Sequence, residues 1–298
     1  MKFACLLCSV LFSFAAAAQS DRFDKVEIKT TKLAGSVYML EGEGGNIGVS
    51  AGADGVFLID DQFGPLTPRI LAAIKAISDK PVRFLINTHW HFDHTGGNEN
   101  LGKAGVVIVA QDNVRKRLAA KTAIDFFKSD YGPSPPAALP VITFRENVTF
   151  HVNGDTATAM HVPNAHTDGD SIIYFRTANV VHMGDTYFSG LYPFIDVGTN
   201  GSVKGVIAAV DRVLGMIDDT TKIIPGHGPL SGKRDLRAYR DMLAKVTASV
   251  ERMVKAKKTL QEVLAAKPSK DFDAAWGGGF LKPDQFVEIV YTSLAKGK

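Results

Sequence analysis

The sequence predicts an α/β protein in which two mixed β-sheets lie face to face with helices on their outer sides. Short runs rich in β-branched residues recur in both halves of the 298-residue chain, separated by turns that contain glycine. Such runs are typical of strands. Amphipathic stretches with helical spacing stand among them without strict strand–helix alternation, which favours mixed sheets over a purely parallel one.

The first half of the chain begins with strands and then places a helix before a buried strand. Thr67 is expected to be the N-cap of this helix, with Pro68 in its first turn, where proline is well tolerated. Residues 129–140 contain four prolines and are expected to be irregular. The strands expected here are Val26–Thr30, Val37–Glu41, Ile47–Ser50, Val56–Ile59, Val82–Ile86 and Gly105–Ala110, with a second helix near Asn113–Lys121.

The second half contains more short strands and ends in helices. Ser202 is a candidate N-cap for one helix, and a longer helix from Asp235 carries an apolar stripe that a coiled coil or a helix packed on its own sheet would both explain. Thr259 and Glu262 have the spacing of a capping box. The expected strands are Val141–Phe144, Val148–Val152, Ala157–Val162, Ser171–Phe175, Val180–His182 and Lys222–Ile224.

Residues 1–18 have the pattern of an export signal. Lys2 precedes an apolar run that is too short to span a bilayer, and four alanines before Gln19 offer a cleavage site. Cys5 and Cys8 leave a lipoprotein signal open as an alternative, but Leu7 is larger than the residue such a signal needs. We therefore expect an exported protein, periplasmic or secreted, with residues 19–298 forming a single domain whose last part, about 235–298, is a helical extension.

Composition narrows the possible chemistry of the exported chain. Both cysteines lie in the signal, so disulfides and thiolate ligands or nucleophiles are not expected after cleavage. The net charge of +3 falls to +2 without Lys2. This near balance predicts no nucleic-acid partner and no membrane binding after cleavage, and leaves a small-molecule substrate.

The run from His89 to His94 carries the chemistry. It reads H-x-H-x-D-H and places three imidazoles and the carboxylate of Asp93 directly after the expected buried strand Val82–Ile86. Imidazole and carboxylate are side chains that zinc prefers, and loops at the carboxyl ends of strands are where active sites of α/β proteins lie.

Three later segments repeat the same arrangement, an apolar strand followed by a polar turn with one potential ligand. These ligands are His166, Asp185 in Gly-Asp-Thr, and His227 in Gly-His-Gly. Taken alone, His166 and His227 would more often be structural histidines. Asp168 and Asp170 could support a ligand, although a role in forming the turn is expected. His151, His161 and His182 fall inside strands and are expected to be core or surface residues.

With these residues in view, the chain resembles the metallo-β-lactamase superfamily from about Val37 to His227. The resemblance implies a four-layer αββα sandwich with a dinuclear metal site at one edge. It implies that His89, His91 and His166 hold one metal, that Asp93, His94 and His227 hold the other, and that Asp185 bridges them. Zn²⁺, about two per chain, is the expected metal, and the same donors also admit iron or manganese.

The resemblance implies a hydrolase in which a metal-bound hydroxide, held by the catalytic Asp93, attacks an electron-poor carbonyl. Relatives with redox chemistry carry Glu where this chain has His91, which favours hydrolysis. The expected substrates are cyclic amides or esters, including β-lactams. Two positions are expected to approach the substrate: Asn200, by similarity to secreted β-lactamases, and Tyr187.

Several departures leave the substrate open. β-Lactamases usually have Cys or Ser at Asp185, and one subclass has a Lys at Phe188 to grip the drug's carboxylate. A bridging Asp is typical of lactonases and thioesterases, yet lactonases carry a Tyr three residues after it, whereas Tyr187 is two after Asp185. The alternatives are therefore a lactonase- or thioesterase-type ester hydrolase and a non-catalytic metal- or ligand-binding module.

Overall fold

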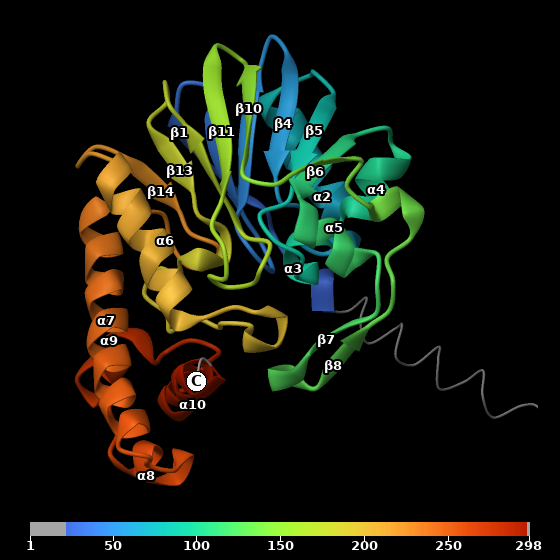
Figure 1. Ribbon diagram of the computed structural model, residues 1–298. Coiled ribbons are helices and arrows are strands. Elements are labelled where there is room, and N and C mark those ends of the chain that lie inside the picture. The colour runs from blue at the N-terminus through green and yellow to red at the C-terminus, as the bar shows by residue number, and fades with distance from the viewer. Residues whose placement is uncertain (1–21, 297–298) are drawn as a thin grey trace, which may run out of the picture.

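The computed structural model describes residues 22–296, and every statement below concerns that range. The expected signal, residues 1–18, lies outside it. Two β-sheets stand face to face in the middle of the molecule with helices on both outer sides (Figure 1). The predicted αββα sandwich of mixed sheets is confirmed.

The first sheet has the order β1-β2-β3-β4-β5-β6-β9. Its first four strands pair antiparallel, and β4, β5, β6 and β9 then follow in parallel. The strands are β1 Lys29–Ala34, β2 Val37–Glu41, β3 Ile47–Gly52, β4 Gly55–Ile59, β5 Val82–Ile86, β6 Val107–Gln111 and β9 Ile142–Phe144.

The second sheet has the order β10-β11-β12-β13-β14-β15 and is antiparallel except where β13 pairs with β14. A separate hairpin joins β7 to β8. The strands are β7 Thr122–Ile124, β8 Ser129–Tyr131, β10 Asn147–Val152, β11 Asp155–His161, β12 Ser171–Phe175, β13 Val180–His182, β14 Lys222–Ile224 and β15 Ser231–Gly232.

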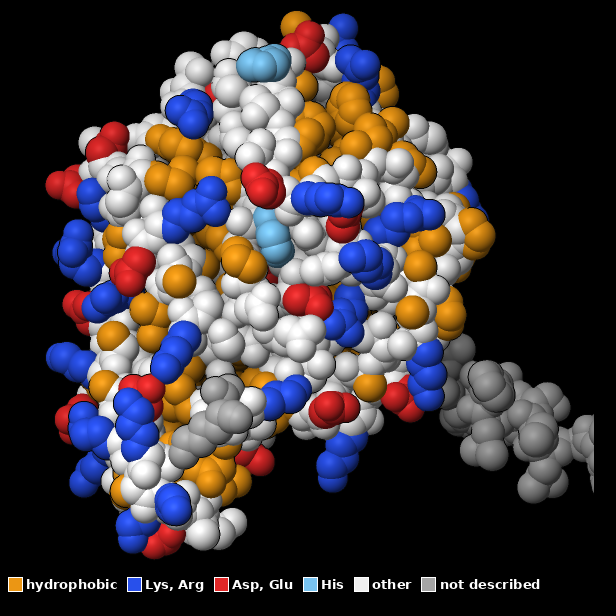
Figure 2. Space-filling view, viewed as in Figure 1, with side chains coloured by type: hydrophobic (Ala, Val, Ile, Leu, Met, Phe, Trp, Pro, Cys, Tyr) orange, Lys and Arg blue, Asp and Glu red, His pale blue; other side chains and the backbone are white. Residues whose placement is uncertain are grey.

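The helices form the two outer layers and the C-terminal part of the chain. They are α2 Thr67–Ile77, α3 Phe92–Thr95, α4 Asn98–Lys103, α5 Asp112–Leu118, α6 Val203–Met216, α7 Lys233–Lys255, α8 Leu260–Ala265, α9 Asp273–Trp276 and α10 Pro283–Lys296. Within residues 22–296, no helix is both long and apolar enough to cross a membrane. Their outer faces carry interspersed basic and acidic side chains (Figure 2).

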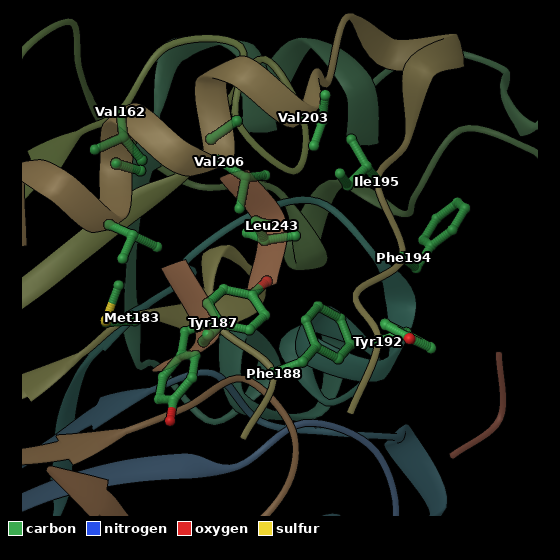
Figure 3. Close-up of a cluster of buried hydrophobic side chains, with 14 of the residues drawn as sticks. Val162, Met183, Tyr187, Phe188, Tyr192, Phe194, Ile195, Val203, Val206 and Leu243 are labelled. Carbon is green, nitrogen blue, oxygen red and sulfur yellow. The ribbon is translucent and has the colours of Figure 1, made fainter. Parts of the chain in front are cut away.

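Strand periodicity explains the layers. Met39 of β2 belongs to the cluster between the sheets, which also contains Ile173 of the second sheet. Its neighbour Leu40 belongs to the cluster on the α2 side. Successive side chains of a strand point to opposite faces, so one run of apolar residues serves two interfaces. On the outer face of the second sheet, a third cluster packs this sheet against α6, α7 and α10. Figure 3 shows Met183, Val206 and Leu243 within this cluster.

Local signals in the sequence agree with several helix ends. The Ser202 side chain accepts a hydrogen bond from Gly205 N and caps α6, and Thr259 and Glu262 form the expected capping box of α8. The stripe from Asp235 onward is buried against the molecule's own core, so α7 is a packed helix and not a coiled coil.

Three local predictions are wrong. The first strand begins at Lys29 and not at Val26, because its pairing partner β2 sets its limits. Thr67 is the first residue of α2, not its cap, since a 3-10 turn over Gly64–Leu66 runs directly into the helix. Residues 129–140 are not wholly irregular, because β8 pairs with β7.

Candidate metal centre

The strand ends bring all seven predicted ligands to one place. His89 and His91 leave β5, Asp93 and His94 lie in α3, His166 lies between β11 and β12, Asp185 follows β13 and His227 follows β14. The ligand atoms form two neighbouring groups: His89, His91, His166 and Asp185, and Asp93, His94 and His227. Within each group these atoms lie within 4.8 Å of one another.

Asp185 lies between the two groups. Its Oδ2 is 3.5 Å from His166 Nε2 in the first group and 3.4 Å from His227 Nε2 in the second. Its Oδ1 is 3.0 Å from His94 Nε2. A carboxylate in this position could therefore contribute to a cation in each group.

Glycines make this close approach possible. A Cβ on Gly226 would lie 2.0 Å from Asp185 Oδ1, and a Cβ on Gly45 would lie 2.0 Å from the His94 ring. Any side chain at either position would therefore displace a ligand.

Carboxylates outside the ligand set orient the imidazoles. Asp60 Oδ2 is 2.8 Å from His94 Nδ1, and Asp196 Oδ2 is 3.1 Å from His91 Nε2. Because a carboxylate only accepts, each of these ring nitrogens carries the proton. On His91 the opposite nitrogen, Nδ1, is left with a lone pair directed at the cluster. His94 Nε2 lies 3.0 Å from Asp185 Oδ1, and although burial would lower the pKa of His94, the carboxylates of Asp185, Asp93 and Asp60 raise it well above its usual value.

The other two buried imidazoles are oriented in the same way. His166 Nδ1 donates to the carbonyl oxygen of Phe194 at 2.8 Å. Thr88 Oγ1 donates to Asp60, so it accepts from His89 Nδ1 at 3.0 Å. The Nε2 atoms of both rings therefore face the cluster as acceptors, and that of His89 is buried without a hydrogen-bond partner.

These lone pairs face one another at short range. His91 Nδ1 is 2.9 Å from His166 Nε2, although neither nitrogen has a proton to share when both rings are neutral. Opposed acceptors repel, and a cation between them removes the repulsion. The donor set, imidazoles and carboxylates without thiolate, therefore fits a divalent metal such as zinc.

The protonation of the metal-free cluster follows from burial and charge. Burial lowers the pKa of His166 to about 4, against the pull of Asp185, so this ring is neutral. Burial would also lower the pKa of His227, but the carboxylates of Asp185 and Asp93 raise it to about 9. Burial opposes ionisation of Asp93, yet His94 and His227 hold its pKa at about 2. A dication would take the place of the proton on His227.

The cluster opens into a cavity of about 560 Å³. Asp93 and His227 are 24% and 21% exposed, whereas the side chains of the other ligands are at most 5% exposed. Reactants therefore approach from the side of Asp93 and His227. Aromatic rings line much of this cavity.

The two expected substrate contacts lie elsewhere. Asn200 is exposed, adopts a left-handed backbone (φ 67°) and donates from Nδ2 to Asp168 Oδ2 at 3.1 Å. Tyr187 is fully buried, with its ring 5.0 Å from that of Tyr239 in the core. Neither residue is among those lining the cavity. The side chain that follows Tyr187, Phe188, points to the site instead and stacks on His227.

The remaining polar candidates have structural partners. His182 Nε2 donates to the carbonyl oxygen of Asn46, and its Nδ1 accepts from Gly184 N, so it joins two loops beneath the site. Asp170 accepts from Thr167 and closes the turn, as expected, and burial raises its pKa to about 8. Asp168 also pairs with Arg117 at 2.6 Å, a contact that the turn alone does not require.

Sequence reasoning missed three residues of the site. Asp60 follows the apolar strand β4, as the ligands follow theirs, and this pattern could have revealed it. Asp196 lies in the segment before α6, where no local pattern marks it. Phe280 reaches the cavity from the C-terminal part of the chain, and no local pattern could have placed it there.

Comparison with known proteins agrees with this geometry. The family model described as "Metallo-beta-lactamase superfamily" matches residues 30–232. The chain is 27% identical over 157 residues to the hydroxyacylglutathione hydrolase of Pelagibacter ubique, which covers 52% of this chain and 56% of that protein. It spans about half the length of the first curated relatives it matches.

Solved structures show the same fold. A metallo-beta-lactamase from Pontibacter korlensis superposes with a TM-score of 0.59 at 20% identity, over 73% of this chain and 99% of that one. A sec-alkylsulfatase from Pseudomonas sp. superposes with a TM-score of 0.64 at 18% identity, over 92% of this chain and 51% of that one.

A sandwich of this kind with a His–Asp cluster at its strand ends defines a class of hydrolases that act on small molecules. Because the family match extends over more than half of its length, the chain belongs to the metallo-beta-lactamase superfamily.

Proposed function

We propose that the protein is an exported dinuclear zinc hydrolase that opens cyclic amides or esters. His89, His91 and His166 would hold one zinc ion and Asp93, His94 and His227 the second, and Asp185, which lies between the two groups, would contribute to both. The observation that carries this proposal is the pair of opposed lone-pair nitrogens, His91 Nδ1 and His166 Nε2. Asp196 and the Phe194 carbonyl orient their rings, and the ionised carboxylates of Asp93 and Asp185 lie beside them.

The metal ions, when bound, supply an acidified water and a Lewis acid for the scissile carbonyl. The protein's own side chains would orient the attacking water and accept its proton. Asp93 stays ionised and faces the cavity, so it accepts the proton of the attacking water and orients it. A substrate bound against the aromatic rings that line the cavity would displace water from them, which would strengthen the electrostatic interactions inside the site. No serine or cysteine nucleophile is needed.

Ester and β-lactam substrates differ in what they require of this site. A β-lactam presents a carboxylate, and the position that carries a gripping Lys in one β-lactamase subclass is Phe188 here. A simple lactone needs no such contact. We therefore propose both reactions and expect β-lactam turnover to be the weaker one.

Metal content and turnover test the proposal together. The protein without residues 1–18, loaded with zinc, should bind about two ions per chain by mass spectrometry and calorimetry. It should hydrolyse a lactone, and more slowly a chromogenic cephalosporin, and a chelator should abolish both activities until zinc is restored. Asp93→Asn should lower kcat by about 10²–10⁴, whereas the matched control Asp211→Asn, on the surface of α6, should retain it.

The outcomes separate the alternatives. Activity that a chelator does not affect would overturn the metal mechanism. Zinc binding without turnover of any ester or amide would favour a non-catalytic binding module. Iron or manganese restoring more activity than zinc would correct the metal but not the reaction.

A further inference from the structure

Aromatic side chains surround the candidate metal centre on three sides. The first wall is Phe63, Phe92 and Tyr131, whose rings follow one another at centroid distances of 5.5 and 4.9 Å. Phe92 immediately precedes the ligand Asp93, so this wall begins at the reacting centre.

The second wall is Phe127 and Phe194, with ring centroids 4.8 Å apart. Phe194 lies 5.9 Å from the ring of His91 and 5.7 Å from that of His166. Figure 3 shows Phe194 on the side of the buried cluster away from Met183.

The third wall is Phe188 and Phe280, with centroids 6.2 Å apart. Phe188 stacks on the ligand His227 at 5.1 Å and an interplanar angle of 18°. Each wall therefore begins at or beside a candidate metal ligand and extends toward the mouth of the cavity. A substituent next to the scissile bond of a substrate would lie against these aromatic rings.

The outer ends of two walls are exposed. Phe127 is 44% and Phe280 is 51% exposed, which is unusual for large apolar side chains. Both line the cavity, so a bound molecule would cover part of their apolar surface. Exposed apolar surface at the mouth of a cavity is typical of a binding site.

The cavity offers no free positive charge from a side chain. Among the described residues that line it, Arg22 is the one Lys or Arg, and its guanidinium pairs with Glu43 and lies 5.1 Å from the centre of the Phe63 ring. A substrate carboxylate placed among the aromatic walls would lose its hydration without gaining an ionic partner there, which is costly.

We propose that this site selects neutral esters, lactones included, whose acyl chain is alkyl or aryl, and discriminates against the same chain ending in a carboxylate. This inference rests on the proposed hydrolysis and names its substrate class. In the reaction, water adds to the carbonyl carbon and the bond from that carbon to the leaving oxygen breaks. One proton of the water passes through Asp93 to the leaving oxygen or to solvent.

A matched pair of substrates tests the inference on the zinc-loaded protein. p-Nitrophenyl octanoate and the mono-p-nitrophenyl ester of suberic acid have the same chain length and differ at the far end, methyl against carboxylate. From acetate to octanoate, kcat/KM should rise by about fourfold for each methylene that the walls bury. The suberate ester should be at least about tenfold slower than the octanoate. Equal rates, or no dependence on chain length, would overturn the inference.

Substitutions in the walls provide the second test. Phe280→Ala and Phe127→Ala should reduce the dependence on chain length, and Phe188→Lys should raise kcat/KM for the suberate ester relative to the octanoate. Ile142→Ala, which shortens an exposed apolar side chain outside the cavity, should leave both ratios as in the unmodified protein. An unchanged chain-length dependence in both alanine variants would show that the walls do not contact the substrate.

A binding measurement separates this inference from the proposed function. The fluorescence of the neutral dye N-phenyl-1-naphthylamine should increase with the protein, with or without zinc. Octan-1-ol should displace the dye better than octanoate does. If no ester is hydrolysed but this order of displacement holds, the proposed hydrolysis fails and the pocket preference stands. If esters are hydrolysed but octanoate displaces the dye equally well, the preference fails and the hydrolase stands.

Discussion

Replacing Asp196 by Asn tests whether an outer carboxylate controls the metal centre. Asp196 is 2% exposed and makes three contacts: Oδ2 accepts from His91 Nε2 at 3.1 Å and from Thr199 Oγ1 at 2.7 Å, and Oδ1 accepts from Thr199 N at 3.3 Å. An amide has one acceptor oxygen where the carboxylate has two, so it cannot keep this pattern.

The structure shows which contact the amide would lose. If its oxygen keeps the bond from Thr199 N, its nitrogen faces His91 Nε2 and donates there. His91 must then carry its proton on Nδ1, the atom directed at His166, and it can no longer bind a metal through Nδ1. If the amide is rotated by 180°, its nitrogen lies opposite Thr199 N instead, and two hydrogen-bond donors face each other.

We expect zinc affinity at the first site to fall by about 10- to 100-fold, which corresponds to about 1.4–2.7 kcal/mol. Competition with a chromophoric chelator measures this change, and Asp211→Asn is the matched control. An Asp196→Asn protein that binds zinc as tightly as the control would refute the reasoning that Asp196 selects the tautomer of His91.

Three further predictions follow from packing and charge. Gly226→Ala should abolish tight zinc binding and cost about 1–3 kcal/mol of stability, because the added methyl would lie 2.0 Å from Asp185 Oδ1. The pKa of His227 in the metal-free protein is raised from 6.5 to about 9. The stability that its protonated ring gains from Asp185 and Asp93 is therefore complete below pH 6.5 and is lost as the pH rises through about 9. Thermal denaturation in chelator should show this loss, and zinc addition at pH 8 should release protons to an indicator dye. Leu243→Ala, on the buried face of α7, should lower the free energy of unfolding by about 2–5 kcal/mol in urea titrations.

Gly215→Ala adds a methyl to α6 in open space and should stabilise the protein by about 0.5–1 kcal/mol, so a loss of zinc binding there would point to a general effect of substitution. Stability that rises between pH 6.5 and 9 in the metal-free protein would contradict the protonated His227. Leu71→Ala, at an exposed position of α2, should cost far less than Leu243→Ala.

The sequence was most informative where one physical constraint acts locally. Strands β2, β5, β12, β13 and β14 were predicted with the bounds that the structure has, because each is a compact apolar run between turn-forming residues. The cap of α6 and the capping box of α8 were also predicted, since each depends on a side chain and a backbone amide three residues away.

Prediction failed where distant residues decide the outcome. The β7–β8 hairpin depends on pairing between two segments of three residues each, which are too short to show a pattern, so nothing in residues 129–140 revealed it. The expected contacts of Asn200 and Tyr187 with the substrate came from similarity to secreted β-lactamases and to lactonases. A similar position along the chain does not fix the direction of a side chain, and here Tyr187 points into the core and Phe188 toward His227.

The sequence by itself determined the layered α/β fold and the chemical types that gather at one edge. Strand periodicity and turn residues act over a few positions, and strands of one sheet that run in the same direction have their carboxyl ends at the same edge. Only the tertiary structure decided which nitrogen of each imidazole faces the cluster and what surrounds it. Asp60, Asp196 and Phe280 reach the site from segments far apart in the chain, and such contacts form only when the layers pack.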